Sequence, residues 1–196
     1  MKYFSLLLVS FLMMGCVGKF TDRFIYIDSD TALISWRDKD SEYADKGAFS
    51  ARANSEIYEE YYSFDEDGQD FQIYLVMFAK KYAWVPTSTE TAYKRVMTDL
   101  PLVSHAEELA YSDVIREPKF AYARAIIDRR ACVTFMDYLQ QHARSQGKVF
   151  RSQLFGVYCA KKGDELTDAK ISKVLASYVF DAPAYDGRGI MVASDN

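Results

Sequence analysis

The sequence predicts an α+β fold, an antiparallel β-sheet with two or three helices packed on it. Strand-like runs come in groups and helix-like segments stand apart from them, an order typical of sheets whose helices gather on one face. Aromatic residues make up 15% of the chain, with 15 Tyr and 13 Phe, and such residues are enriched in strands. With 196 residues, 49% of them hydrophobic, the chain is long enough to build one core in one domain.

The first hairpin is predicted near the N-terminus. Residues 24–28 and 33–37 are short strand-like stretches on either side of the polar residues 29–31. The polar stretch 38–55 gives no firm prediction.

A second hairpin is predicted at residues 57–64 and 71–79, around the turn sequence Asp65-Glu66-Asp67-Gly68. Apolar residues between 49 and 64 also recur at spacings of three and four, so a helix is the alternative there. We favour the hairpin.

A helix is predicted after residue 86. Thr87 and Glu90 have the spacing of a capping box, and Pro101 is expected to end the helix. Its apolar stripe consists of Tyr93, Val96, Met97 and Leu100.

The C-terminal half predicts three strands and a helix. Residues 120–127 and 131–139 flank a charged turn, 140–148 is interpreted as a polar loop, and 149–160 is a further strand. Thr167 is expected to cap a helix. One face of that helix carries Ile171, Val174, Leu175 and Tyr178.

The first residues have the features of an export leader. Lys2 is followed by an apolar run from 4 to 14, which is too short to cross a hydrocarbon core of about 30 Å as a helix. Its length is that of a secretory signal peptide.

The end of this run resembles the lipobox of bacterial lipoproteins, in the residues Leu12-Met13-Met14-Gly15-Cys16. The resemblance implies that Cys16 receives a diacylglycerol, is exposed by signal peptidase II and is then acylated on its amine. An ordinary cleaved leader and an uncleaved signal anchor are the alternatives. Val17 at the next position, in place of Asp, favours the outer membrane and a periplasm-facing domain, with the inner membrane as the alternative.

These features predict the domain organisation. Residues 1–15 are the signal peptide, 16–22 the acylated N-terminus and linker, 23–180 a single α+β domain, and 181–196 a flexible tail. Part of the C-terminal half also resembles a group of small proteobacterial lipoproteins without assigned activity. The resemblance covers about a quarter of the chain and lies in Arg129-Arg130-Ala131-Cys132, residues 154–163 and Leu166-Thr167.

Cys132 and Cys159 remain once Cys16 is assigned to lipid. Both lie in apolar, strand-like stretches of an exported chain, so we expect a disulfide between them. Two buried free thiols and a catalytic thiol are the alternatives.

The sequence carries few candidates for catalysis. His105 and His142 are the only two histidines, and neither lies in a zinc or hydrolase motif. The acidic turn at 65–70 suggests calcium, but Tyr74 stands where an EF-hand requires Glu. No cofactor-binding pattern is present, and we expect neither a metal nor a cofactor.

The net charge of −4, with no basic block at all, disfavours nucleic-acid binding. The leading hypothesis is therefore a lipoprotein anchored to the membrane that binds an envelope protein or supports an assembly. A hydrolase acting on envelope polymers, and a glycan or small-ligand binder using a Tyr-rich sheet face, are the alternatives.

Overall fold

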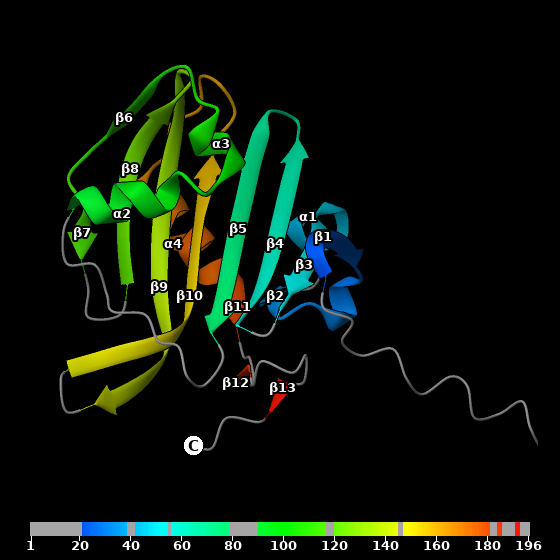
Figure 1. Cartoon of the computed structure of the whole chain (residues 1–196). Helices are drawn as coiled ribbons and strands as arrows, with labels where there is room; N and C mark the ends of the chain where they lie inside the picture. Colours follow the sequence, from blue (N-terminus) through cyan, green and yellow to red (C-terminus); the bar gives the residue numbers. More distant parts are fainter. Residues whose placement is uncertain are drawn as a thin grey trace, which may run out of the picture.

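Nine antiparallel strands form the main sheet in the computed structural model of the chain (Figure 1). The structure describes residues 21–38, 42–54, 56–78, 90–116, 120–144, 147–180, 184–185 and 191–192. For residues 21, 22, 42, 138–144, 147–151, 184, 185, 191 and 192 the description covers the backbone alone.

The sheet has the order β1-β3-β4-β5-β10-β9-β8-β6, and β7 also pairs with β8. Its strands are β1 (Thr21–Ile27), β3 (Ala48–Ala53), β4 (Ile57–Glu66), β5 (Gln69–Phe78), β6 (Leu109–Tyr111), β7 (Ile115–Arg116), β8 (Phe120–Ile127), β9 (Arg130–Arg144) and β10 (Gly147–Cys159). Two small sheets pair β2 (Ile34–Trp36) with β11 (Tyr178–Phe180), and β12 (Ala184–Tyr185) with β13 (Met191–Val192). The helices are η1 (Ser29–Thr31), α1 (Glu42–Lys46), α2 (Glu90–Met97), α3 (Pro101–Ser104) and α4 (Asp168–Ser177).

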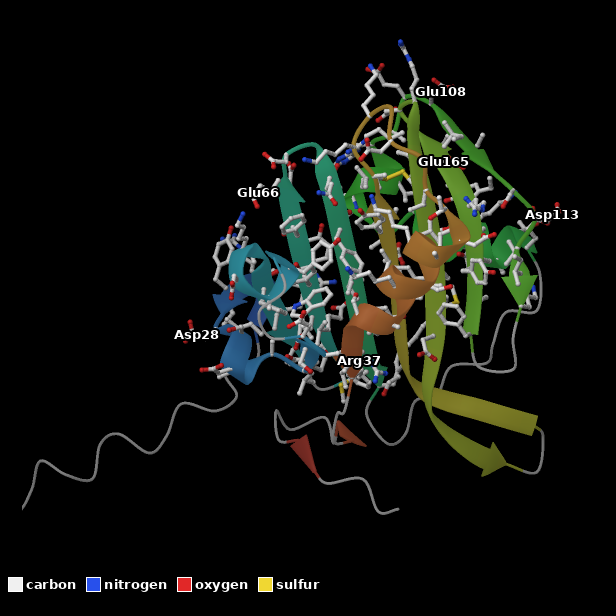
Figure 2. The ribbon with its side chains drawn as sticks, turned by 180° about the vertical axis from the view of Figure 1, so that it is seen from behind. Asp28, Arg37, Glu66, Glu108, Asp113 and Glu165 are labelled. Carbon is white, nitrogen blue, oxygen red and sulfur yellow. A yellow bond between two sulfur atoms is a disulfide. The ribbon has the colours of Figure 1, made fainter. Side chains whose placement is uncertain are left out.

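Helices lie on both faces of the main sheet. We call the face under α2 and α3, which is toward the viewer in Figure 1, the front face. The rear face lies under α4 and is seen in Figure 2. The α+β prediction is confirmed, but the expectation that the helices share one face is wrong, because each face of the central strands carries its own apolar layer.

The front core lies between α2, α3 and strands β8, β9 and β10. Tyr93, Met97 and Leu100 are at most 1% exposed, and they pack with small side chains such as Ala123 on β8. Because alanines on the sheet leave room for large helix side chains, the two layers interdigitate.

The rear core is aromatic. Trp36 on β2 packs against Tyr62 at 4.8 Å and Phe71 at 5.3 Å between ring centroids, both edge-to-face. Phe135 stacks on Tyr178 at 5.2 Å, where β11 crosses the sheet. Tyrosines such as Tyr62, Tyr158 and Tyr178 therefore serve packing in this layer.

Several predicted elements are confirmed. The β4–β5 hairpin replaces the alternative helix, and its turn has positive φ at Asp67 (53°) and Gly68 (77°), the conformation of a type I′ turn. The predicted turn between β8 and β9 likewise has positive φ at Asp128 and Arg129. The hydroxyl of Thr167 accepts from the amide of Lys170 at 3.3 Å and so caps α4.

The first predicted hairpin is wrong, because β1 pairs with β3 and β2 pairs with β11. The chain turns through η1 after β1 and crosses to the rear face, where burying Ile34 and Trp36 outweighs local pairing.

Two other boundaries are corrected. Pro101 begins α3, where it occupies the first helical turn, rather than only ending the helix before it. The predicted polar loop at 140–148 is instead largely strand, because the β9–β10 ladder continues to the pair Arg144 and Gly147. Backbone pairing does not require apolar side chains, so the polar residues of this segment did not indicate a loop. The capping residue Thr87 and most of the predicted tail lie outside the described residues.

A buried carboxylate fastens β2 to the rear face. Glu60 on β4 is fully buried and accepts from the amides of Leu33 at 2.9 Å and Ile34 at 2.8 Å. The hydroxyl of Tyr58 also donates to it at 2.8 Å. Burial raises the pKa of Glu60 even though these three hydrogen bonds lower it.

Cys132 and Cys159 form a disulfide, as predicted. The two residues are direct partners in the β9–β10 ladder, with Cα atoms 4.1 Å apart, and they are separated by 27 positions in the sequence. The bond is buried in the front core beside α2 and α3.

We expect the double substitution Cys132→Ala and Cys159→Ala to lower the free energy of unfolding by about 3–4 kcal/mol, because the unfolded chain loses a cross-link. Urea denaturation followed by tryptophan fluorescence measures the change, and wild-type protein alkylated after reduction is the control. A variant as stable as the oxidised wild type would contradict the expectation.

We expect Glu60→Gln to cost about 1–3 kcal/mol, because the amide nitrogen of Gln would face backbone N–H donors. The difference from wild type is expected to be largest near pH 4 and to shrink as pH rises. The reason is that the pKa of Glu60 is higher in the folded than in the unfolded protein. The protonated carboxyl therefore stabilises the fold, and this stabilisation is lost as the pH rises and the carboxyl ionises. Glu66→Gln, on the exposed end of the same strand, is the control in urea unfolding across pH. A difference that grows toward alkaline pH would refute the assignment.

Candidate functional site

Those sequence-predicted site residues whose side chains the structure describes form no common cleft. Cys16 lies outside the described residues, and the two other cysteines form the structural disulfide. His105 is an exposed residue at the C-cap of α3, where its amide donates to the carbonyl of Pro101 at 3.0 Å. His142 lies on β9 where only the backbone is described. The positions of these residues offer no support for an acid–base pair.

The acidic turn between β4 and β5 distributes its charges among separate cations. Glu66 pairs with Lys46 at 2.5 Å, Asp67 with Lys161 at 3.5 Å, and Asp70 with Arg130. Because each of these three carboxylates pairs with a different cation, they do not converge on one point, and the pair of Asp70 with Arg130 is mostly buried. Within the described part of the chain, no group of three His, Cys, Asp or Glu residues could hold a metal ion.

A row of aromatic and charged side chains crosses the front face where the helices no longer cover it. We call it the transverse row, and it consists of Phe24 on β1, Arg52 on β3, Glu59 on β4, Tyr74 on β5 and Phe155 on β10. Strand alternation places these five residues on one face, because their neighbours Phe49, Tyr62, Phe71 and Leu154 point into the rear core.

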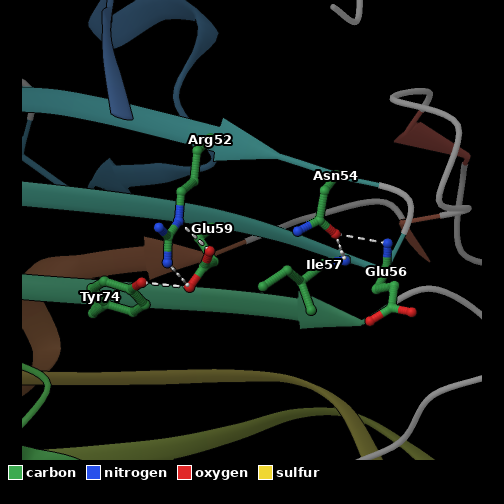
Figure 3. Close-up of polar contacts among 6 residues, drawn as sticks. All are labelled: Arg52, Asn54, Glu56, Ile57, Glu59 and Tyr74. Carbon is green, nitrogen blue, oxygen red and sulfur yellow. Dashed lines mark hydrogen bonds and ion pairs between the residues drawn. The ribbon is translucent and has the colours of Figure 1, made fainter. Parts of the chain in front are cut away.

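The centre of the transverse row is an ion pair (Figure 3). Arg52 and Glu59 are direct cross-strand partners, and the guanidinium binds the carboxylate in a bidentate manner through Nε and Nη2. The hydroxyl of Tyr74 donates to Oε1 of the same carboxylate at 2.5 Å. The side chain of Glu59 is only 8% exposed, whereas that of Arg52 is 36% exposed.

The aromatic members extend this pair in both directions. The guanidinium of Arg52 lies 4.7 Å from the ring centroid of Phe24, a cation–π contact. The rings of Phe24 and Tyr74 meet edge-on at 6.1 Å, and Tyr74 stacks on Phe155 at 5.2 Å. The row therefore connects the outermost strand with the buried centre of the sheet.

The electrostatics of the row favour binding over proton transfer. The hydrogen bond to Glu59 raises the pKa of Arg52, so the guanidinium stays charged. Burial, assisted by the hydrogen bond to Glu59, raises the pKa of Tyr74, so its hydroxyl stays a donor. Both oxygens of Glu59 are engaged by donors, which leaves the carboxylate poorly placed to accept a proton from a substrate.

Strand β1 forms one edge of the sheet, and three of its apolar side chains are exposed. Phe24 is 38%, Ile25 52% and Tyr26 87% exposed. Among the described residues, β1 pairs with β3 alone, so its outer row of backbone groups faces no other strand. The opposite edge is built from β6 and β7, which have three and two residues, and short strands are a known protection against edge pairing.

Two cavities lie on the described surface beside small edge elements of the fold. One of about 280 Å³ lies beside β6 and β8 and is lined by residues that include Tyr111, Arg124 and Leu166. Another of about 210 Å³ lies beside β2 and is lined by residues that include Asp30, Trp36 and Asp45. Neither joins a histidine to a carboxylate, which is what the hydrolase hypothesis requires. In the described residues we also find no helix with the length and apolar character needed to cross a membrane.

Comparison of the chain with protein-family profiles, with curated protein sequences and with solved structures found no match.

Sequence reasoning missed the transverse row because β3 lies in the stretch 38–55, for which no element was predicted. Ala48–Ala53 alternates small and polar residues around Phe49, a weak strand signal. The available clue was Asn54, whose side chain accepts from the amides of Glu56 at 2.8 Å and Ile57 at 2.9 Å and closes the turn into β4 (Figure 3). Asn in such a turn favours a hairpin that sets Arg52 opposite Glu59.

We expect Arg52→Met to lower the free energy of unfolding by about 1–3 kcal/mol, because it leaves the buried carboxylate of Glu59 without its cation. The loss is set below the ~3–5 kcal/mol of a fully buried pair because Arg52 is partly exposed. Adding Glu59→Met should restore most of the stability in urea unfolding. If the double variant were less stable than Arg52→Met alone, the pair would not be the unit we describe.

Proposed function

We propose that this chain is an exported lipoprotein, anchored to the outer membrane by acyl chains on Cys16, that binds another envelope protein at the β1 edge of its sheet. The leader and lipobox support the anchor. The observation that carries the binding function is the uncovered edge of β1 with its exposed apolar side chains.

The proposed binding mode is strand addition. An extended segment of the partner pairs with the outer backbone groups of β1, and those backbone hydrogen bonds supply affinity. Side chains that alternate along β1 supply selectivity, because Phe24 lies on the front face beside Arg52 whereas Ile27 packs toward the rear core. Soluble proteins usually protect a strand of this kind, and an unprotected one is typical of an interaction site.

The anchor and the edge are close together. Five residue steps separate Cys16 from Thr21, which is the first residue of β1. An extended chain covers at most about 18 Å in that number of steps. The anchor would therefore hold β1 near the membrane surface, where a partner embedded in or attached to the same membrane could reach it.

We expect a photoreactive residue placed at position 26 to form an adduct with a specific membrane protein in intact cells, and one placed at position 126 to form far less of it. Tyr26 is on the β1 edge, and Ile126 is an exposed apolar residue on β8, 43% exposed, far from that edge. Adding Ile25→Lys should reduce the adduct by about tenfold, since a charge opposes pairing at the edge. Leu109→Lys, on the opposite edge, is the matched control.

Cys16→Ser tests the anchor in the same cells. We expect the mass of the substituted protein to lack the acyl chains. Equal adducts at positions 26 and 126, or the same yield with Ile25→Lys as with Leu109→Lys, would overturn the binding site. A wild-type protein with an unmodified residue 16 would overturn the anchor.

A further inference from the structure

The β9–β10 hairpin is longer than the sheet that holds it. Strand β8 pairs with β9 only as far as the partner pair Phe120 and Asp137, and β5 pairs with β10 only from Ser152 onward. Beyond those points the ladder continues through residues 139–144 of β9 and 147–150 of β10. This two-stranded ribbon projects past the end of the sheet and turns away from it (Figure 1).

The ribbon has no flanking strand among the described residues. A two-stranded ribbon alone is marginally stable in water, because too little apolar surface is buried to offset the ordering of its backbone. Contact with another surface would therefore stabilise the ribbon.

The sequence of the ribbon and its base is basic in an acidic chain. Residues 138–151 contain Arg144, Lys148 and Arg151 and no Asp or Glu, whereas the whole chain has a net charge of −4. Since these three residues add +3, the rest of the chain has a net charge of −7. This segment therefore carries positive charge with no carboxylate of its own to balance it, and an anionic surface is its natural complement.

The ribbon lies at the same end of the sheet as the start of β1. The strand register gives one row of neighbouring residues across six strands, running Thr21, Ala53, Tyr58, Met77, Ser152 and Leu139. Five strand spacings, or about 24 Å, separate Thr21 from Leu139. The first residue of β1 and the base of the ribbon therefore lie at the same end of the sheet.

We propose that the ribbon formed by residues 139–144 and 147–150 docks on the anionic phospholipid headgroups of the membrane that holds Cys16. This inference rests on the proposed anchor. Two attachments, one acyl and one electrostatic, fix the tilt of the sheet relative to the membrane. A fixed tilt would present the β1 edge in one orientation to its partner.

Hydrogen exchange of the full lipidated protein tests the proposal. The protein is reconstituted in vesicles of phosphatidylglycerol with phosphatidylethanolamine and, separately, in vesicles of phosphatidylcholine. We expect amides of 139–144 and 147–150 to exchange about tenfold or more slowly on the anionic vesicles, because each cation near such a surface strengthens contact about fivefold. The slowing should disappear at about 1 M salt, where the screening length falls to about 3 Å.

Charge variants locate the effect. Replacing Arg144, Lys148 and Arg151 with Gln should abolish the slowing on anionic vesicles. Replacing Arg129, Lys161 and Lys162 with Gln, at the opposite end of β9 and β10, should leave it intact. Both triple variants remove three positive charges, so a difference between them reports position and not net charge.

The outcomes separate this inference from the proposed function. Flotation with vesicles but equal exchange on anionic and neutral lipid would overturn the ribbon docking alone. Slowing that appears only when envelope proteins are added would also overturn it, in favour of an acidic protein partner. Failure to float with either vesicle would overturn the anchor and this inference together.

Discussion

The structure depends on the burial of β10 and its two neighbours on both faces. Every residue of β10 from Ser152 to Cys159 is buried, and the strand must fit between a front layer of helices and a rear layer of aromatic side chains. Gly156 shows how tight that fit is. A Cβ atom there would lie 2.4 Å from the ring of Phe135 and 2.6 Å from the carbonyl oxygen of Gln72. Away from this centre the front layer ends, and strands β1, β3 and β4 keep one face without a helix over it (Figure 1).

That asymmetry explains why charge is tolerated in the sheet on the β4 side. Glu59 and Glu60 are adjacent in sequence and face opposite sides, yet each is buried and satisfied in its own way. Glu59 has a cation and a phenol as partners, whereas Glu60 has two backbone amides and a phenol. The hydrogen bonds of Glu59 join β3, β4 and β5 within the main sheet, whereas those of Glu60 join the start of β2 to that sheet. Removing either carboxylate would leave donors without acceptors.

How much the sequence could predict depended on whether a signal was local. The β4–β5 and β8–β9 hairpins were predicted because a few consecutive residues determine each turn. Helix α4 was predicted because Thr167 and the apolar stripe lie within one short segment. The disulfide was expected because export was predicted and because Cys132 and Cys159 are the pair that remains once Cys16 is assigned to lipid. The partners of β1 and β2 were missed because residues distant in sequence determine them. Glu60 accepts a hydrogen bond from the amide at the start of β2, and Tyr178 lies 142 positions beyond its ladder partner Trp36.

The candidate site was beyond sequence reasoning for a similar reason. Phe24 and Phe155 belong to one row only because β1, β3, β4, β5 and β10 lie in that spatial order, which no periodicity reveals. The ribbon was missed for a different reason, since polar residues were equated with a loop. Strand pairing is made by the backbone, and a ribbon that is not sandwiched between apolar layers does not need apolar side chains.

The cross-strand disulfide also acts as a test of alignment during folding. Cys132 and Cys159 face each other directly, so only the native offset of β9 against β10 brings the two thiols together. A shift by a single position would turn every side chain of one strand to the opposite face and separate the sulfurs. Oxidation therefore cross-links chains in which β9 and β10 are correctly aligned and leaves misaligned chains reduced.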